Sequence, residues 1–117
     1  MSDTESKFDL GFLNKISGGD KVFIVDMINT FKEQVPEYVD QSKAYFADKN
    51  YDALSRVAHK FLPGVSFLGI KFLEGDIALI EEYAKKQENL EALPELLESS
   101  YKKIDEIVAS LNKEFNL

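Results

Sequence analysis

The chain of 117 residues contains no cysteine and one histidine, and these shortages restrict the chemistry it can perform. Without cysteine, it cannot form disulfides, thiolate zinc sites, iron–sulfur clusters or a cysteine nucleophile. A single histidine is too few for a multi-histidine metal centre. No stretch approaches the roughly 18 consecutive apolar residues of a membrane-spanning helix. We therefore expect no cofactor or metal bound by this chain and no contact with a membrane.

Acidic side chains outnumber basic ones by 21 to 14, which gives a net charge of −7 at pH 7. Nucleic acids and anionic membrane surfaces attract cationic proteins, so neither is expected as a partner. Apolar residues make up 44% of the chain and charged residues 30%, the balance of a folded protein. The acidic start lacks the basic and apolar regions of a signal peptide, which favours a cytoplasmic location. The length suits a single domain over residues 1–117, with residues 1–7 as a frayed tail.

Glycine and proline are scarce, and apolar residues recur at spacings of three and four, which indicates helix almost throughout. We expect a short helix capped by Asp9, and a long helix that begins at Asp20 and is kinked at Pro36. Further helices are expected over about 50–68, 70–86 and 90–115. The predicted fold is all-α: an antiparallel up-down four-helix bundle with a short extra N-terminal helix capping one end.

His59 lies outside the apolar face of the third predicted helix. At about 100° per residue, six apolar residues fall on one side of that helix: Leu54, Val57, Ala58, Phe61, Val65 and Leu68. His59 lies about 140° from Leu54 on the same wheel, so we expect its ring to face solvent. Four neighbours surround the ring and leave it sterically open: Ser55, Leu62, Pro63 and Ser66.

The sequence around His59 lacks acidic residues. Residues 53–73 contain none, although the chain has 21, and the same window contains Arg56, Lys60 and Lys71. A local excess of positive charge suits a site that receives a phosphoryl group or another anion. A mostly buried helix would also lack acids, so the pattern is compatible with an incidental surface histidine.

Pro63 lies four residues after His59 and has no N–H to bond the His59 carbonyl in an α-helix. One interpretation is that Pro63 and Gly64 form a turn that ends the helix. Val65 and Leu68 continue the apolar face in phase, however. We therefore predict a kinked but continuous helix.

The segment Ala58-His59-Lys60-Phe61, followed by Leu68-Gly69, resembles the histidine-containing phosphotransfer (HPt) domain of multistep phosphorelays. That family usually reads Ala-His-x-Leu-Lys-Gly, with a later Leu-Gly pair at the spacing seen here. The resemblance extends over nearly the whole chain, including the Gly-Gly-Asp start of the second helix. It implies that His59 is the phosphoacceptor and that Glu81, on the next helix, lies near the ring.

The resemblance also implies a function and a set of partners. His59 would accept a phosphoryl group from the phosphoaspartate of a response-regulator receiver domain and pass it to another receiver. A hybrid sensor histidine kinase would be the source of the phosphoryl group, and the receiver would bring Mg²⁺. The sequence contains neither GxxxxGK[ST] nor GxGxxG, so we expect no ATP-dependent kinase activity of its own.

Two positions depart from the family pattern, because Leu62 replaces the usual lysine and Pro63 the usual glycine. Three lysines are candidates to hold the phosphoryl oxygens instead: Lys60, Lys71 and Lys85. Glu81 is a further supporting candidate. Gly64 is expected to supply part of the clearance that the partner needs. The partner would dock on the neighbours of the ring and on Phe12 of the first helix.

Two other functional classes stay open at this point. The first is a helical adaptor that binds receiver domains without being phosphorylated, which the loss of the usual lysine would favour. The second is a helical enzyme with a pair of catalytic carboxylates. No pair of acids lies on an apolar face, and the adjacent acids Glu81-Glu82 and Asp105-Glu106 are typical of solvated helix surfaces.

Overall fold

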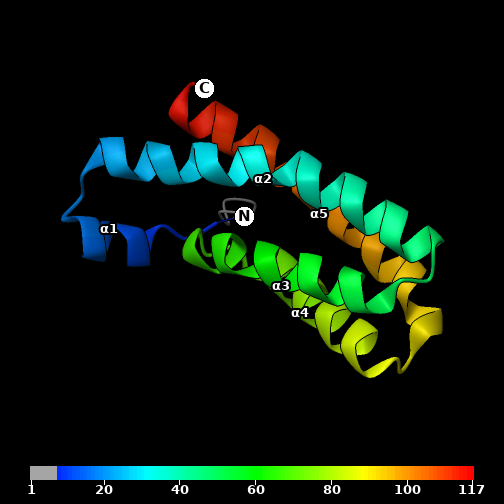
Figure 1. The fold of residues 1–117 in the computed structure, drawn as a ribbon. Coiled ribbons are helices and arrows are strands. Elements are labelled where there is room, and N and C mark those ends of the chain that lie inside the picture. The colour runs from blue at the N-terminus through cyan, green and yellow to red at the C-terminus, as the bar shows by residue number, and fades with distance from the viewer. Residues whose placement is uncertain (1–7) are drawn as a thin grey trace.

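The computed structural model describes residues 8–117, and every regular element in this range is helical (Figure 1). The elements are α1 (Gly11–Ser17), α2 (Lys21–Ala47), α3 (Tyr51–Phe67), α4 (Lys71–Lys86), the 3₁₀ turn η2 (Leu90–Ala92) and α5 (Leu93–Phe115). The predicted all-α class is confirmed. The frayed tail predicted for residues 1–7 lies outside the described residues. No helix between residues 8 and 117 is both long and apolar enough to cross a bilayer.

The four long helices enclose one apolar core. α3 packs against α2 on one side and α4 on the other, while α5 packs against α4 and α2 (Figure 1). α1 packs against α2. Side chains from every helix are fully buried, among them Leu13, Ile28, Leu54, Ile77 and Ile104. Each such side chain contributes about 1.5–3 kcal/mol through removal of its surface from water.

Polar side chains accept hydrogen bonds at the starts of three helices: Asp20 and Asn50 are the N-caps of α2 and α3, while Asp9 lies one residue before Leu10, the N-cap of α1. Oδ1 of Asp9 accepts a hydrogen bond from the N–H of Gly11 at 2.9 Å. Oδ1 of Asp20 accepts one from Val22 at 3.0 Å, and Oδ1 of Asn50 accepts one from the third residue of α3 at 3.2 Å. These bonds satisfy N–H groups that have no partner within the first turn of a helix.

Both interior prolines lie within continuous helices. α2 runs through Pro36 and α3 runs through Pro63. The prediction of a continuous third helix is therefore confirmed, and the alternative of a turn at Pro63 is wrong. The apolar residues beyond Pro63 remain in phase and are buried, which compensates for the backbone hydrogen bond that the proline removes.

The last helix begins three residues later than predicted. Residues Leu90–Ala92 form a 3₁₀ turn, in which the N–H of Leu93 bonds the carbonyl of Leu90. An α-helix starting at Leu90 would need the N–H of Pro94 for that carbonyl. Because proline has no N–H, the tighter turn takes its place and the α-helix begins at Leu93.

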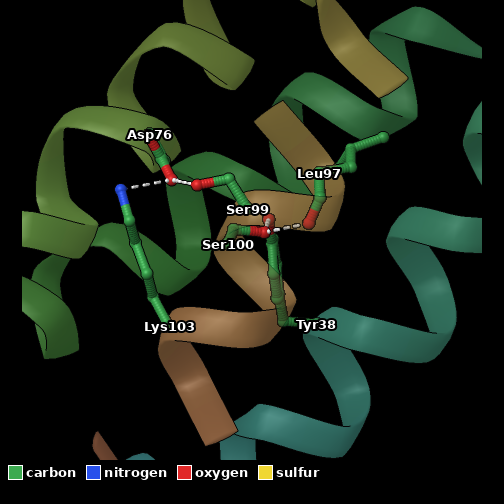
Figure 2. Close-up of polar contacts among 6 residues, drawn as sticks. All are labelled: Tyr38, Asp76, Leu97, Ser99, Ser100 and Lys103. Atoms are coloured by element: carbon green, nitrogen blue, oxygen red, sulfur yellow. Dashed lines mark hydrogen bonds and ion pairs between the residues drawn. The ribbon is translucent and has the colours of Figure 1, made fainter. Parts of the chain in front are cut away.

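A buried hydroxyl pair joins α5 to α2 (Figure 2). Tyr38 is 1% exposed, and its hydroxyl lies 2.9 Å from Oγ of Ser100. Oγ of Ser100 donates to the carbonyl of Leu97 at 2.7 Å, so the Tyr38 hydroxyl is the donor to Ser100. Burial raises the pKa of Tyr38 well above its usual value, since a phenolate would lose its hydration there.

A second polar contact joins α5 to α4 (Figure 2). Oδ2 of Asp76 accepts hydrogen bonds from Ser99 at 2.7 Å and from Nζ of Lys103 at 3.0 Å. The Asp76 carboxylate is 14% exposed, so its charge needs these donors. The two contacts together fix the orientation of α5 against the rest of the bundle.

Gly69 holds the N-terminal segment against the turn between α3 and α4. The N–H of Asp9 bonds the carbonyl of Leu68 at 3.0 Å. Gly69 has φ +63°, and a Cβ at this position would lie 2.3 Å from the carbonyl oxygen of Asp9. The glycine of the Leu-Gly pair is therefore required both by its backbone conformation and by the close approach of Asp9.

We predict that Gly69→Ala lowers the free energy of unfolding by at least about 2 kcal/mol, because it adds left-handed strain and a backbone clash. Urea denaturation measures the change. Gly75→Ala is the matched control. Gly75 lies on an exposed side of α4 with nothing within 4 Å of an added Cβ, so this variant should gain about 0.5–1 kcal/mol. Equal stability of the Gly69 variant and the wild type would contradict the assignment.

Candidate functional site

His59 lies in the middle of α3 and its side chain leaves the bundle. The helix buries Leu54, Ala58 and Phe61 in the core, and the ring emerges on the opposite side with a side-chain exposure of 76%. The exposure predicted from the helical wheel is confirmed. A rigid helix therefore presents the chain's one imidazole to solvent.

Glu81 of α4 holds one nitrogen of this ring. Nδ1 of His59 lies 2.7 Å from Oε2 of Glu81, whose side chain is 23% exposed. Ser55, one turn before His59, donates its hydroxyl to the backbone carbonyl of Glu81 at 3.1 Å. Two bonds from α3 thus fix Glu81 in place, one to its backbone and one to its carboxylate.

The Glu81 contact determines which nitrogen of the neutral ring carries the proton. An ionised carboxylate only accepts hydrogen bonds, so the proton of the neutral imidazole is placed on Nδ1. Nε2 then carries the lone pair. Neither nitrogen contacts another side chain among residues 8–117. The arrangement presents a nucleophilic nitrogen on the exposed edge of the ring, with an anion behind it to stabilise positive charge that develops during attack.

The residues predicted to surround the ring have different exposures. Pro63 is exposed, while Leu62 and Ser66 are half-buried, and Ser66 donates to Glu74 at 2.7 Å. Ser55 is only 7% exposed. The expectation that Ser55 belongs to the open docking surface is wrong, because its hydroxyl is used between α3 and α4.

Gly64 faces α2 instead of the His59 side of α3. A Cβ on Gly64 would lie 3.1 Å from Oε1 of Gln34 and 3.9 Å from the ring of Phe31. The prediction that Gly64 clears space for a docking partner is therefore wrong. Its lack of a side chain instead allows α2 to approach α3.

The predicted acid-free environment does not hold in three dimensions. Acids from outside the 53–73 window approach its residues: Glu81 contacts His59, Glu74 contacts Ser66, Glu37 pairs with Lys60 at 3.3 Å and Asp52 pairs with Arg56. A sequence window reports neighbours along one helix only. Adjacent helices, and the residue just before the window, supply the missing carboxylates.

The three candidate lysines occupy different places around His59. Lys60 is paired with Glu37 on the α2 side of α3. Lys71 is at the start of α4, about 15 Å of helix rise from Glu81. Lys85 lies one turn after Glu81 on the same side of α4. Glu81 and Lys85 line a shallow hollow of about 290 Å³ together with Ala78, Glu82 and Lys86.

Phe12 is half-exposed, at 51%, and stacks on Phe67 of α3 with ring centroids 5.8 Å apart. Phe67 was not among the predicted docking residues, and its own exposure is 39%. The helical wheel contains the signal, because Phe67 lies about 220° from Leu54 and outside the apolar face. Phe12 and Phe67 form an apolar surface at the C-terminal end of α3, where α1 contacts it.

The Hpt domain family matches residues 26–114, and the chain belongs to this family. The fold is also that of a solved member. The crystal structure of histidine-containing phosphotransfer protein B (HptB) from Pseudomonas aeruginosa PAO1 matches with a TM-score of 0.82 and 22% sequence identity, covering 92% of this chain and 93% of that one. No curated protein sequence matches the chain at a significant level.

We predict that Glu81 sets the tautomer of His59. In the wild type, long-range ¹H–¹⁵N spectra should show the neutral ring protonated at Nδ1, because the carboxylate accepts that proton. Glu81→Ala should raise the population of the Nε2–H tautomer, since Nδ1 then has only water to bond. Glu82→Ala, which removes a neighbouring acid that pairs with Lys86, should leave the tautomer unchanged. A wild-type ring protonated mainly at Nε2 would contradict the assignment.

Proposed function

We propose that this chain is a phosphorelay intermediate that accepts a phosphoryl group on Nε2 of His59 from a receiver-domain phosphoaspartate and passes it to another receiver. The observation that supports this most strongly is an exposed ring whose other nitrogen is bonded to Glu81. A hybrid sensor histidine kinase would be the upstream source, and the protein would act in the cytoplasm as a single domain. It would have no ATP-dependent kinase activity of its own.

The transfer step needs one bond to form and one to break. The lone pair of Nε2 attacks the phosphorus of the aspartyl phosphate, and the P–O bond to the aspartate breaks, so that its carboxylate leaves. The proton on Nδ1 remains there, facing Glu81. The ring gains positive charge beside that carboxylate, which stabilises the phosphohistidine. Reversal of the same step on a second receiver passes the group on. Mg²⁺ brought by the receiver would neutralise negative charge on the phosphoryl oxygens.

We assign the role of the missing family lysine to Lys85. Leu62 gives no charge at the usual position, Lys60 is paired with Glu37, and Lys71 lies too far along α4. In the hollow that Glu81 and Lys85 line on α4, Glu82 pairs with Lys86 at 3.5 Å and Glu81 is bonded to His59. The charge of Lys85 therefore remains for a phosphoryl group on Nε2.

The architecture suits this role. We propose that α2 to α5 form an antiparallel up-down bundle, with α1 covering one end, and that the receiver docks across the exposed side of α3. Leu62, Pro63 and Ser66 would lie beneath it, and the Phe12–Phe67 pair would extend the apolar contact. Apolar contact at the centre with charges at the rim suits a module that serves more than one receiver.

A non-catalytic adaptor that binds receivers is the alternative function. Leu62 favours it, because an apolar side chain stands where the family usually places a phosphate-binding lysine. The Glu81 contact favours the relay, since an adaptor has no need for an oriented nucleophile.

The function is tested with a panel of receiver domains phosphorylated by acetyl phosphate and Mg²⁺. Labelled phosphate should move to the wild-type chain from at least one receiver as an acid-labile, base-stable adduct. His59→Gln should accept none, because it removes the nucleophile. Receiver binding without any transfer to the wild type would instead establish the adaptor.

Lys85→Gln should slow transfer from the same receiver by about tenfold, because it removes one charge-assisted hydrogen bond in the transition state. Lys71→Gln makes the same change in net charge at the other end of α4 and should transfer at the wild-type rate. Lys85→Arg should recover most of the rate. Equal slowing in the Lys71 and Lys85 variants would show a general charge effect and remove Lys85 from the site.

A further inference from the structure

Pro63 removes the backbone donor of one carbonyl, and that carbonyl belongs to His59. In α3 the N–H of residue 63 would bond the carbonyl of residue 59, and proline has no N–H. Four side-chain hydroxyls among residues 8–117 donate to backbone carbonyls, and these are the carbonyls of Asp26, Val39, Glu81 and Leu97. None of them reaches His59.

The His59 carbonyl opens on the same side of α3 as the ring. His59 and Pro63 are both exposed, and Leu62 between them is half-buried. Carbonyls on the solvent side of a helix tilt outward, and loss of the N–H partner increases this freedom. A strong acceptor therefore lies in the same residue as the reacting nitrogen, on the face that a partner must approach.

We propose that the His59 carbonyl is a docking contact that accepts a hydrogen bond from the receiver domain. This inference rests on the proposed phosphorelay function. In the free protein, water bonds the carbonyl. A backbone N–H, hydroxyl or ammonium of the receiver replaces that water and fixes the receiver's position relative to Nε2. A single hydrogen bond of this kind changes affinity by about three- to tenfold. Pro63 thus acts as a specificity-determining residue through the backbone of its neighbour.

α2 contains the same backbone feature on a different face and provides a control. Pro36 removes the donor for the carbonyl of Lys32. The side chain of Lys32 bonds Asn112 of α5 at 2.6 Å. Glu37, which faces α3, lies about 100° round α2 from Pro36. A receiver that docks over His59 would not contact the Lys32 carbonyl.

The experiment compares Pro63→Ala with Pro36→Ala in the full chain, using two phosphodonors. Phosphoramidate is a small donor that labels an accessible histidine without docking. The second donor is a phosphorylated receiver from the panel, used over a range of concentrations. Both variants regain a helical N–H, so both should unfold at a higher temperature than the wild type. Pro63→Gly is a second variant at position 63, which also regains the N–H but carries no side chain.

The proposal predicts a split between the two donors. Phosphoramidate should label all three variants at the wild-type rate. With the receiver, Pro63→Ala and Pro63→Gly should raise the half-saturating concentration about three- to tenfold and leave the maximal rate unchanged. Pro36→Ala should behave as the wild type.

Three outcomes would overturn the proposal. A half-saturating concentration that does not change in the Pro63 variants would show that the carbonyl is not a contact. An equal rise in Pro36→Ala would show a general effect of helix rigidity. Slower labelling of the Pro63 variants by phosphoramidate would show that Pro63 acts by placing the ring. Failure of the relay function itself looks different, because the wild type would then take no label from any receiver.

Discussion

The hydrogen bond between Nδ1 of His59 and Oε2 of Glu81 connects the reactive ring to a second helix. A histidine on a single helix rotates freely in solvent, and its two nitrogens exchange the proton readily. Here the carboxylate accepts from Nδ1, and Ser55 holds the backbone of Glu81 from the α3 side. The remaining nitrogen is oriented outward without being covered, which is the requirement for a group that must both receive and release a phosphoryl unit.

The rest of the bundle keeps α3 and α4 in the register that this bond needs. The turn between them is fixed by Gly69, whose left-handed backbone lets the segment at Asp9 close over it. α5 is held against α4 by Asp76 and against α2 by Tyr38, each through buried or nearly buried polar contacts. Function thus depends on apolar packing that is common to helical bundles and on a few polar bonds that fix its alignment.

The local features of this protein could be predicted from the sequence. Contacts between helices could not, apart from the His59–Glu81 contact that the family resemblance implies. The exposure of His59 follows from its position relative to Leu54 on one helix, and the cap at Asp20 follows from local hydrogen bonding. A helical wheel misplaces Ser55 and Gly64, because it identifies the apolar side of a helix but not which neighbouring helix covers each flank. The acid-free window fails for the same reason, since Glu81 contacts His59 and Glu37 contacts Lys60 from other helices.

The two departures from the family motif both lie on the exposed side of α3, where Leu62 removes a cation and Pro63 removes a backbone donor. Together they make this face more apolar, so the positive charge that holds the phosphoryl group has to come from α4. The central claim is that Glu81 reserves Nδ1 and leaves Nε2 to react. It is tested most directly by ³¹P–¹⁵N couplings in the chain after transfer from a phosphorylated receiver. The account predicts phosphorus on Nε2 of His59. Phosphorus on Nδ1, or on any other residue, would contradict it.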